Sequence, residues 1–143
     1  MLRITESQDL SKAIYYEDSN FLDKPDLSPE DLINHNVFPH KKVPLENETN
    51  TYVTIDITDY KPVARNPRFK RATVYIYVLV HESLSTTDYG ELRMDFILSR
   101  LDQIFNGARG IGDFKLDFKS VRDVYVNERY SGKYVAYDLR EFN

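Results

Sequence analysis

Residues 73–81 read TVYIYVLVH and carry the strongest strand pattern in the chain. One set of alternating positions is entirely aliphatic, and the other set is Tyr75, Tyr77 and Leu79. Successive side chains of a β-strand point to opposite faces of the sheet, so both faces of this strand are apolar. A strand of this kind is typical of the centre of a sheet that is covered on both sides.

The preceding residues predict a partner strand. Residues 52–58 alternate between aliphatic and polar side chains, which is the pattern of a half-buried strand. Residues 59–72 contain two prolines and several charges, and we interpret them as a long polar connection between the two strands. The first two strands therefore predict a hairpin.

The following residues predict a helix and a second hairpin. Residues 88–105 have helical apolar spacing, and Asn106-Gly107 is a suitable stop because glycine adopts the left-handed conformation cheaply. Residues 114–119 alternate and continue towards Val126, and residues 134–139 form the last strand. The order β-β-α-β-β predicts an α+β fold, in which a small, mostly antiparallel sheet carries one long helix on one face.

Nine apolar residues are expected to form the core of this fold. They are Val74, Ile76, Val78, Leu92, Phe96, Leu101, Phe114, Leu116 and Phe118. One helix covers only one face of a sheet, so the opposite face needs another cover. We expect either the N-terminal segment or another subunit to provide it, because monomers rarely leave such a patch in water.

Residues 1–50 differ from the rest of the chain. They are acidic, are interrupted by four prolines and show no sustained strand pattern. Residues 5–16 predict a short helix, and Ser28-Pro29 is a good start for another. We expect one domain over residues 1–143, in which this helical and extended segment drapes over an α+β core formed by residues 51–143.

Composition excludes several classes of protein. The chain of 143 residues has no cysteine, which excludes a disulfide scaffold, a cysteine-ligated zinc site and a thiol nucleophile. Its formal net charge of −4 is not the basic footprint of a nucleic-acid-binding domain. No apolar run approaches the roughly 18 residues of a membrane span, and the N-terminus lacks the apolar core of a signal peptide.

Two weak patterns point to chemistry. Asp117-Phe118-Lys119 has the spacing with which many nucleases hold a metal and activate water, and Asp113 would be the second acid. The simpler interpretation is the wet side of a half-buried strand. The glycine-rich run 107–112 follows a helix instead of opening one, so it does not form a phosphate cradle. We expect no cofactor, no metal and no catalytic residue.

One basic cluster stands out in the long connection. It comprises Arg65, Arg68, Phe69, Lys70 and Arg71. It is either a projecting arm that touches an acidic partner or nucleic acid, or a charged loop tip that keeps the protein in solution. With Tyr75 and Tyr77 on the uncovered face, these residues are the candidate interface.

Three stretches carry a resemblance to a known family. They are Val37-Phe38-Pro39-His40 through Val43-Pro44 to Thr51-Tyr52-Val53, His81 through Leu92 and Phe105 to Gly112, and Gly132-Lys133-Tyr134 onward to Phe142. Together with the order of elements, they resemble the tail-terminator, or tail-completion, proteins of tailed bacteriophages. The resemblance covers about two-thirds of the chain, and the first 35 residues lie outside it.

The resemblance implies a mechanical function in the virion. Such proteins form a ring, commonly a hexamer, that caps the tail tube in the neck and joins it to the head connector. DNA passes through the lumen without specific binding, and assembly takes place in the host cytoplasm without a membrane. The implied partners are other copies of the chain, the tail tube protein and the connector. A metal-dependent nuclease using Asp117 and Lys119 and a monomeric cytosolic adaptor remain the alternatives.

Overall fold

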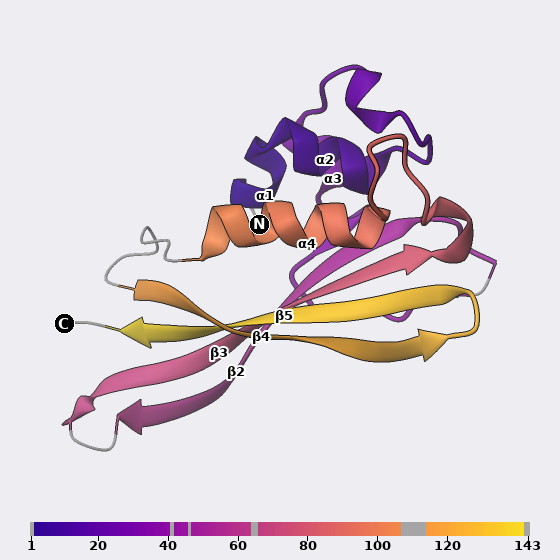
Figure 1. Ribbon diagram of the computed structural model, residues 1–143. Coiled ribbons are helices and arrows are strands. Elements are labelled where there is room, and N and C mark those ends of the chain that lie inside the picture. Colours follow the sequence, from indigo (N-terminus) through magenta and orange to yellow (C-terminus); the bar gives the residue numbers. More distant parts are fainter. Residues whose placement is uncertain (1, 41, 46, 64–65, 107–113, 142–143) are drawn as a thin grey trace.

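One twisted sheet organises the chain (Figure 1). The structure is a computed structural model that describes residues 2–40, 42–45, 47–63, 66–106 and 114–141, with the backbone alone described at 2, 59–63, 66–71, 114 and 140–141. Its strands are β1 (Val37–Phe38), β2 (Thr51–Val63), β3 (Asn66–His81), β4 (Phe114–Asn127) and β5 (Tyr130–Glu141). Their order is β1-β2-β3-β5-β4, and every pairing except the parallel β1–β2 pair is antiparallel. The predicted α+β class and the central position of β3 are confirmed.

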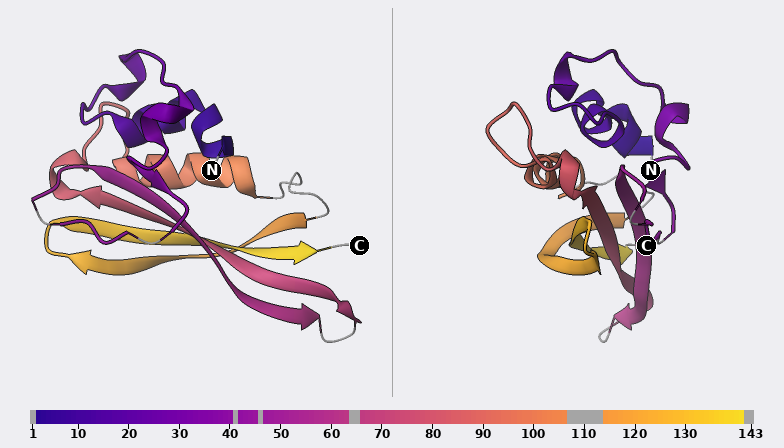
Figure 2. Two further views of the ribbon diagram at one scale, coloured as in Figure 1. Left: turned by 180° about the vertical axis from the view of Figure 1, so that it is seen from behind. Right: turned by 90° about the vertical axis from the view of Figure 1, so that its right-hand side faces the viewer.

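The helices lie together on one face of this sheet, as the two views of Figure 2 show. They are α1 (Leu2–Glu6), α2 (Gln8–Tyr15), α3 (Pro29–Leu32) and α4 (Arg93–Phe105), with short 3-10 turns η1 (Phe21–Asp23) and η2 (Glu82–Leu84). The helix predicted over residues 5–16 is two helices that meet at Ser7. At the start of α3, the Ser28 amide donates to the Asp31 carboxylate over 2.8 Å, so this predicted helix start is correct.

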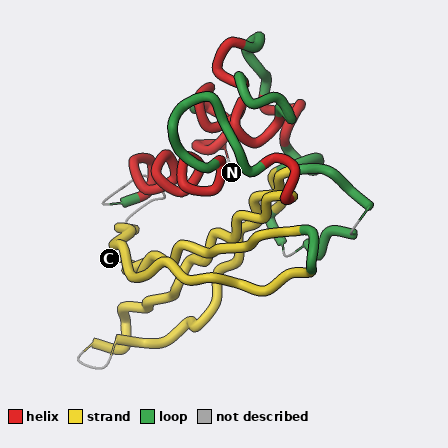
Figure 3. The backbone as a smooth tube through the Cα atoms, turned by 45° about the vertical axis from the view of Figure 1, so that its right-hand side comes forward, coloured by secondary structure: helices red, strands yellow, loops and turns green. Residues whose placement is uncertain are grey.

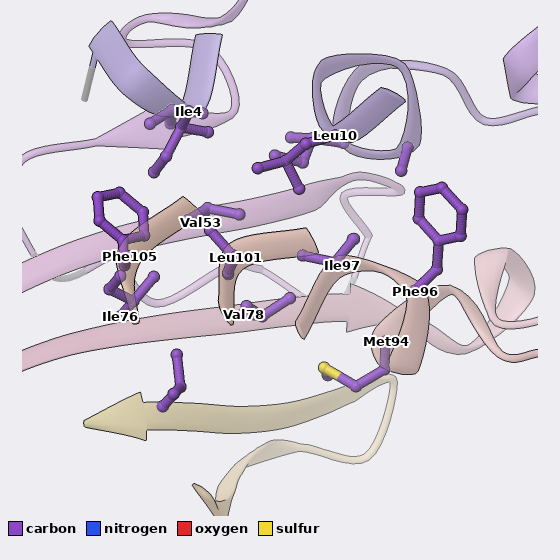
Figure 4. Packing of buried hydrophobic residues seen from close by; sticks show 14 of the residues in the cluster. Ile4, Leu10, Val53, Ile76, Val78, Met94, Phe96, Ile97, Leu101 and Phe105 are labelled. Carbon is purple, nitrogen blue, oxygen red and sulfur yellow. The ribbon is translucent and has the colours of Figure 1, made fainter. Parts of the chain in front are cut away.

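The core lies between the sheet and the helices (Figure 4). The aliphatic face of β3 packs under α4, and the N-terminal helices add Ile4 and Leu10 to the same cluster. Six of the nine predicted core residues are buried: Val74, Ile76, Val78, Phe96, Leu101 and Leu116. The side chain of Phe114 lies outside the described part.

Two core predictions are wrong. Leu92 is 51% exposed because α4 begins at Arg93 and not at Asp88. Gly90 has φ +82°, a left-handed backbone conformation that an α-helix cannot include, and this accounts for the late start. Phe118 is 48% exposed: it shares a face with the buried Tyr137, its register partner, but it lies on the edge strand β4.

The described parts of the predicted connection, residues 59–63 and 66–72, form a strand pair and not a loop. The pairing of β2 with β3 continues past Thr58–Thr73 through Lys61–Arg71 to Pro62–Lys70. We call residues 59–63 and 66–70 the hairpin arm. Within the described residues, β5 pairs with β3 only from Arg71 onward, so the arm extends past it and away from the helices (Figure 3). The loop was predicted from two prolines, Pro62 and Pro67. Proline is nevertheless tolerated in a strand where no neighbouring strand needs its N–H.

Candidate interaction surface

Three tyrosines gather on the sheet face opposite the helices. Tyr75 and Tyr77 come from β3, and Tyr134 comes from β5 as the register partner of Tyr77. The Tyr134 ring lies 5.3 Å from that of Tyr75 and 5.8 Å from that of Tyr77, centroid to centroid. All three side chains are half-buried. We call them the tyrosine cluster. A tyrosine side chain combines a rigid apolar ring with a polar hydroxyl at its end, and this combination is suited to a protein interface.

Residues 42–45 and 47–50 cover the neighbouring part of this face. Tyr52, Leu79 and Tyr130 form a second buried cluster there. Tyr52 Oη donates to the Glu48 carboxylate over 2.6 Å, and Tyr130 Oη donates to the Glu48 carbonyl over 2.6 Å. The N-terminal segment therefore covers one end of the face that the sequence predicts to be uncovered, and the tyrosine cluster stays partly open.

The phenols under this segment have raised pKa values. Burial, and then the hydrogen bond to the Glu48 carboxylate, raises the pKa of Tyr52 to about 12. Burial also raises the pKa of Tyr130. Both groups are therefore neutral hydrogen-bond donors at physiological pH, and they act as structural anchors.

A groove of about 180 Å³ opens between the covered and the open part of the face. Its lining is predominantly apolar. The residues are Lys42, Val43, Thr54, Tyr77, Leu79, Val124, Tyr125 and Val126. The exposed Val43 and Tyr125 stand at its margin, and Tyr77 joins it to the tyrosine cluster. The groove and the cluster together form a continuous candidate interaction surface.

The basic cluster lies on the hairpin arm and at its base. Arg65 lies outside the described residues, and Arg68, Phe69, Lys70 and Arg71 belong to β3, with only their backbone described. Arg71 is four residues from Tyr75, or about 13 Å along the strand. The structure thus places the predicted basic residues and tyrosines on one strand, while their role as an interface stays a prediction.

The possible nuclease residues are held in ion pairs. Asp117 and Asp138 are register partners on adjacent strands, a repulsive arrangement when both are charged. Lys115 Nζ lies 3.6 Å from the Asp117 carboxylate, and Lys119 Nζ lies 3.9 Å from that of Asp138. Each carboxylate therefore has its own lysine. Asp113, the second acid of the hypothesis, lies outside the described residues.

The other candidate motifs do not come together as a site. His81 Nδ1 is 2.8 Å from Ser83 Oγ at the end of β3, which is a turn contact. Within the part of the chain that the structure describes, no three histidine, cysteine or acidic residues are grouped so as to hold a metal. The glycine-rich run 107–112 lies outside the described residues.

Two functional or structural residues escaped sequence reasoning. Tyr134 completes the tyrosine cluster, and its alternation with the buried Val135 was a signal, although the register that pairs it with Tyr77 was not readable. Arg93 is fully buried, and nothing in the sequence distinguishes it from a surface arginine.

Comparison with known proteins adds the family. None of the helices in the described ranges has the length and apolar character to cross a membrane. A comparison with curated proteins finds no match. The YomW family model matches residues 7–139, which include every described strand apart from the last two residues of β5. The chain belongs to the YomW family, a phage-derived family from the yom region of SPbeta-like Bacillus phages.

Proposed function

We propose that this protein is a structural component of the phage particle that forms a ring on the end of the tail tube. The ring ends tube growth and offers its other side to the head connector, and DNA passes through its lumen. The phage-derived family supports a role in the phage. The resemblance of the sequence to tail terminators suggests this particular role. Its partners are other copies of the chain, the tail tube protein and the connector.

The observation that carries the proposal is the unequal cover of the sheet. The helices bury one face, whereas the other keeps the tyrosine cluster and an apolar groove at its surface. Proteins that stay monomeric rarely keep large contiguous apolar patches in water. The hairpin arm adds a second contact, because it reaches past the rest of the sheet.

The proposed role needs no catalytic step. The pairing of Asp117 with Lys115 and of Lys119 with Asp138 supports a structural role for these charges. Incubation with plasmid and single-stranded DNA and Mg²⁺ or Mn²⁺ tests this part. DNA cleavage that disappears in Asp117→Ala would establish the nuclease alternative instead.

Deletion of the gene from its phage tests the ring. We expect particles whose tails have uncontrolled length and are not joined to heads, as seen by electron microscopy. A plasmid copy of the wild-type gene should restore normal particles. Normal tails without the gene would refute the proposed role.

Substitutions test the surface. A Tyr75→Ser, Tyr77→Ser copy should fail to restore joined particles, because it removes two aromatic rings from the proposed contact. The matched control is Tyr15→Ser, which removes a tyrosine that is 41% exposed at the end of α2. The control should restore particles fully. Circular dichroism and thermal melting of both variants check that folding is intact.

A further inference from the structure

The sheet has two open edges, and their residues belong to the same register rows. On one side, β4 is the last strand of the described sheet along its whole length. On the other side, β1 pairs only with Val53 and Thr54 of β2, so residues 55–63 of β2 have β3 as their single described partner. Figure 2 shows β2 and β4 on opposite sides of the sheet. Open edges carry backbone donors and acceptors that can pair with another chain.

Strand direction makes these edges complementary. The pairings β2–β3, β3–β5 and β5–β4 are all antiparallel, so β4 runs opposite to β2. A second copy in the same orientation therefore presents its β2 antiparallel to β4 of the first copy. Both copies therefore keep the same orientation. A repeating head-to-tail contact requires this common orientation.

Two apolar rows run from edge to edge on the helix side of the sheet. One row is Ile57–Val74–Tyr137–Phe118 and the other is Ile55–Ile76–Val135–Val121, in register order. Their interior members are buried, but Ile57 is 44%, Phe118 48% and Val121 43% exposed. The exposed apolar residues thus lie at both ends of the first row and at the β4 end of the second, whereas Ile55 is partly buried. A neighbouring copy would continue each row and bury them.

One acidic residue on the opposite face fits this alignment, whereas Lys61 belongs to the register row that ends at Lys115, so those two like charges would face each other. Asp56 belongs to the register row that ends at Ser120 of β4. In a neighbouring copy, Ser120 is flanked by Lys119 and Arg122, on the same strand. In this alignment Asp56 of one copy lies close to Arg122 of the next, while Lys119 stays paired with Asp138. Opposite charges across strands stabilise a pair, and they also disfavour wrong registers.

We propose that copies of this chain join by antiparallel pairing of β4 with residues 55–63 of β2 in the next copy, so that Phe118 packs against Ile57. This inference rests on the proposed ring and names its interface. The contact is heterologous, so it closes into a ring when the rotation between copies divides the circle. The tyrosine cluster remains available to the tail tube or the connector.

Engineered disulfides test this pairing. The chain has no cysteine, so Ile57→Cys, Phe118→Cys gives a clean background. In one chain these positions are three strand spacings apart, about 14 Å, well beyond the roughly 7 Å that a disulfide spans between Cα atoms. Oxidation of the purified protein and of phage particles should give a ladder of covalent multimers that reductant removes. Each single variant should give no ladder beyond a dimer.

The matched control places the second cysteine on the same strand, β4, but in a different register row. Tyr125 also lies on β4, but its register row ends at Thr51, six residues from Ile57 along β2. Ile57→Cys, Tyr125→Cys should therefore form no ladder. No ladder from Ile57→Cys, Phe118→Cys, or equal ladders from both pairs, would overturn the proposed contact. The tail phenotype of the gene deletion tests the proposed ring independently of the disulfides. Failure of the β4–β2 contact can therefore be distinguished from failure of the ring.

Discussion

Arg93 Nη1 donates a hydrogen bond of 2.6 Å to the main-chain carbonyl of Ala13, eighty residues earlier in the chain. The same guanidinium donates to the carbonyls of Leu84, Tyr16 and Asp18 over 2.7, 3.0 and 2.9 Å. It thereby binds the unsatisfied carbonyls at the C-terminal end of α2, where a positive charge is also favoured by the helix dipole. Burial lowers the pKa of Arg93, and the nearby Asp18 opposes this effect. One side chain thus fastens the N-terminal segment to the start of α4.

Replacing this arginine should destabilise the whole domain. Arg93→Met replaces the guanidinium by an apolar side chain and leaves several buried carbonyls without a donor. Each unpaired carbonyl costs about 1–3 kcal/mol. We expect the free energy of unfolding, measured with urea, to fall by at least this amount. The control is Arg129→Met, which removes an exposed ion pair to Glu82 and should cost about 0–1 kcal/mol. Equal losses in the two variants would show that the buried contacts contribute little.

Phe96 tests the packing between α4 and the N-terminal segment. Its ring is 3% exposed and lies 5.1 Å from the ring of Phe21 in an edge-to-face arrangement. Phe96→Ala should lower the free energy of unfolding by about 3–5 kcal/mol because it leaves a cavity. Leu92→Ala, at the exposed position four residues earlier, should change it by less than about 0.5 kcal/mol. A loss under about 1 kcal/mol for Phe96→Ala would contradict the observed helix register.

Tyr52 predicts a loss of stability at high pH. Its pKa is about 12 in the folded chain and about 10 when unfolded, so the folded state holds the proton more tightly. This contribution is complete below pH 10 and is lost as the pH rises from 10 to 12. The ionisation of tyrosines can be followed by ultraviolet absorbance as the pH is raised. The titration curve of the wild type minus that of Tyr52→Phe gives the curve of the Tyr52 phenol alone. A difference curve with its midpoint near 10 would contradict the buried contact with Glu48.

Much of the fold was readable because it depends on local patterns. The two-sided apolar strand of residues 73–81, the alternation of residues 52–58 and Ser28 at a helix start each report their own environment. The start of α4 was not readable, because the left-handed Gly90 and not the apolar spacing determines it. The hairpin arm was missed because its prolines are acceptable only where no third strand pairs, which is a tertiary property.

The candidate surface was only partly readable for the same reason. Tyr75 and Tyr77 follow from alternation within one strand, whereas Tyr134 joins them through the register of β3 with β5. The anchoring of the segment around Glu48 depends on a contact with Tyr130, 82 residues away. Likewise, the matching open edges of β2 and β4 become visible only when the order of all strands is known.

The basic residues of the hairpin arm give the last prediction. Arg68 and Lys70 lie on the described backbone of the arm and Arg71 lies at its base, where the strand pair extends beyond β5, whereas Arg65 lies outside the described residues. We expect this basic cluster to reach acidic residues on a neighbouring subunit or the tail tube. Replacement of all four by serine should reduce the joining of tails to heads, counted by electron microscopy. Charges at a rim mainly steer encounter, so added salt should slow assembly of the wild type more than it weakens finished particles. The control replaces Lys24, Arg100, Arg129 and Lys133 by serine, which removes the same charge from ion pairs away from the arm and from the β4 edge. Normal joining by the arm variant, or an equal defect in the control, would show that the arm is only a solvated hairpin.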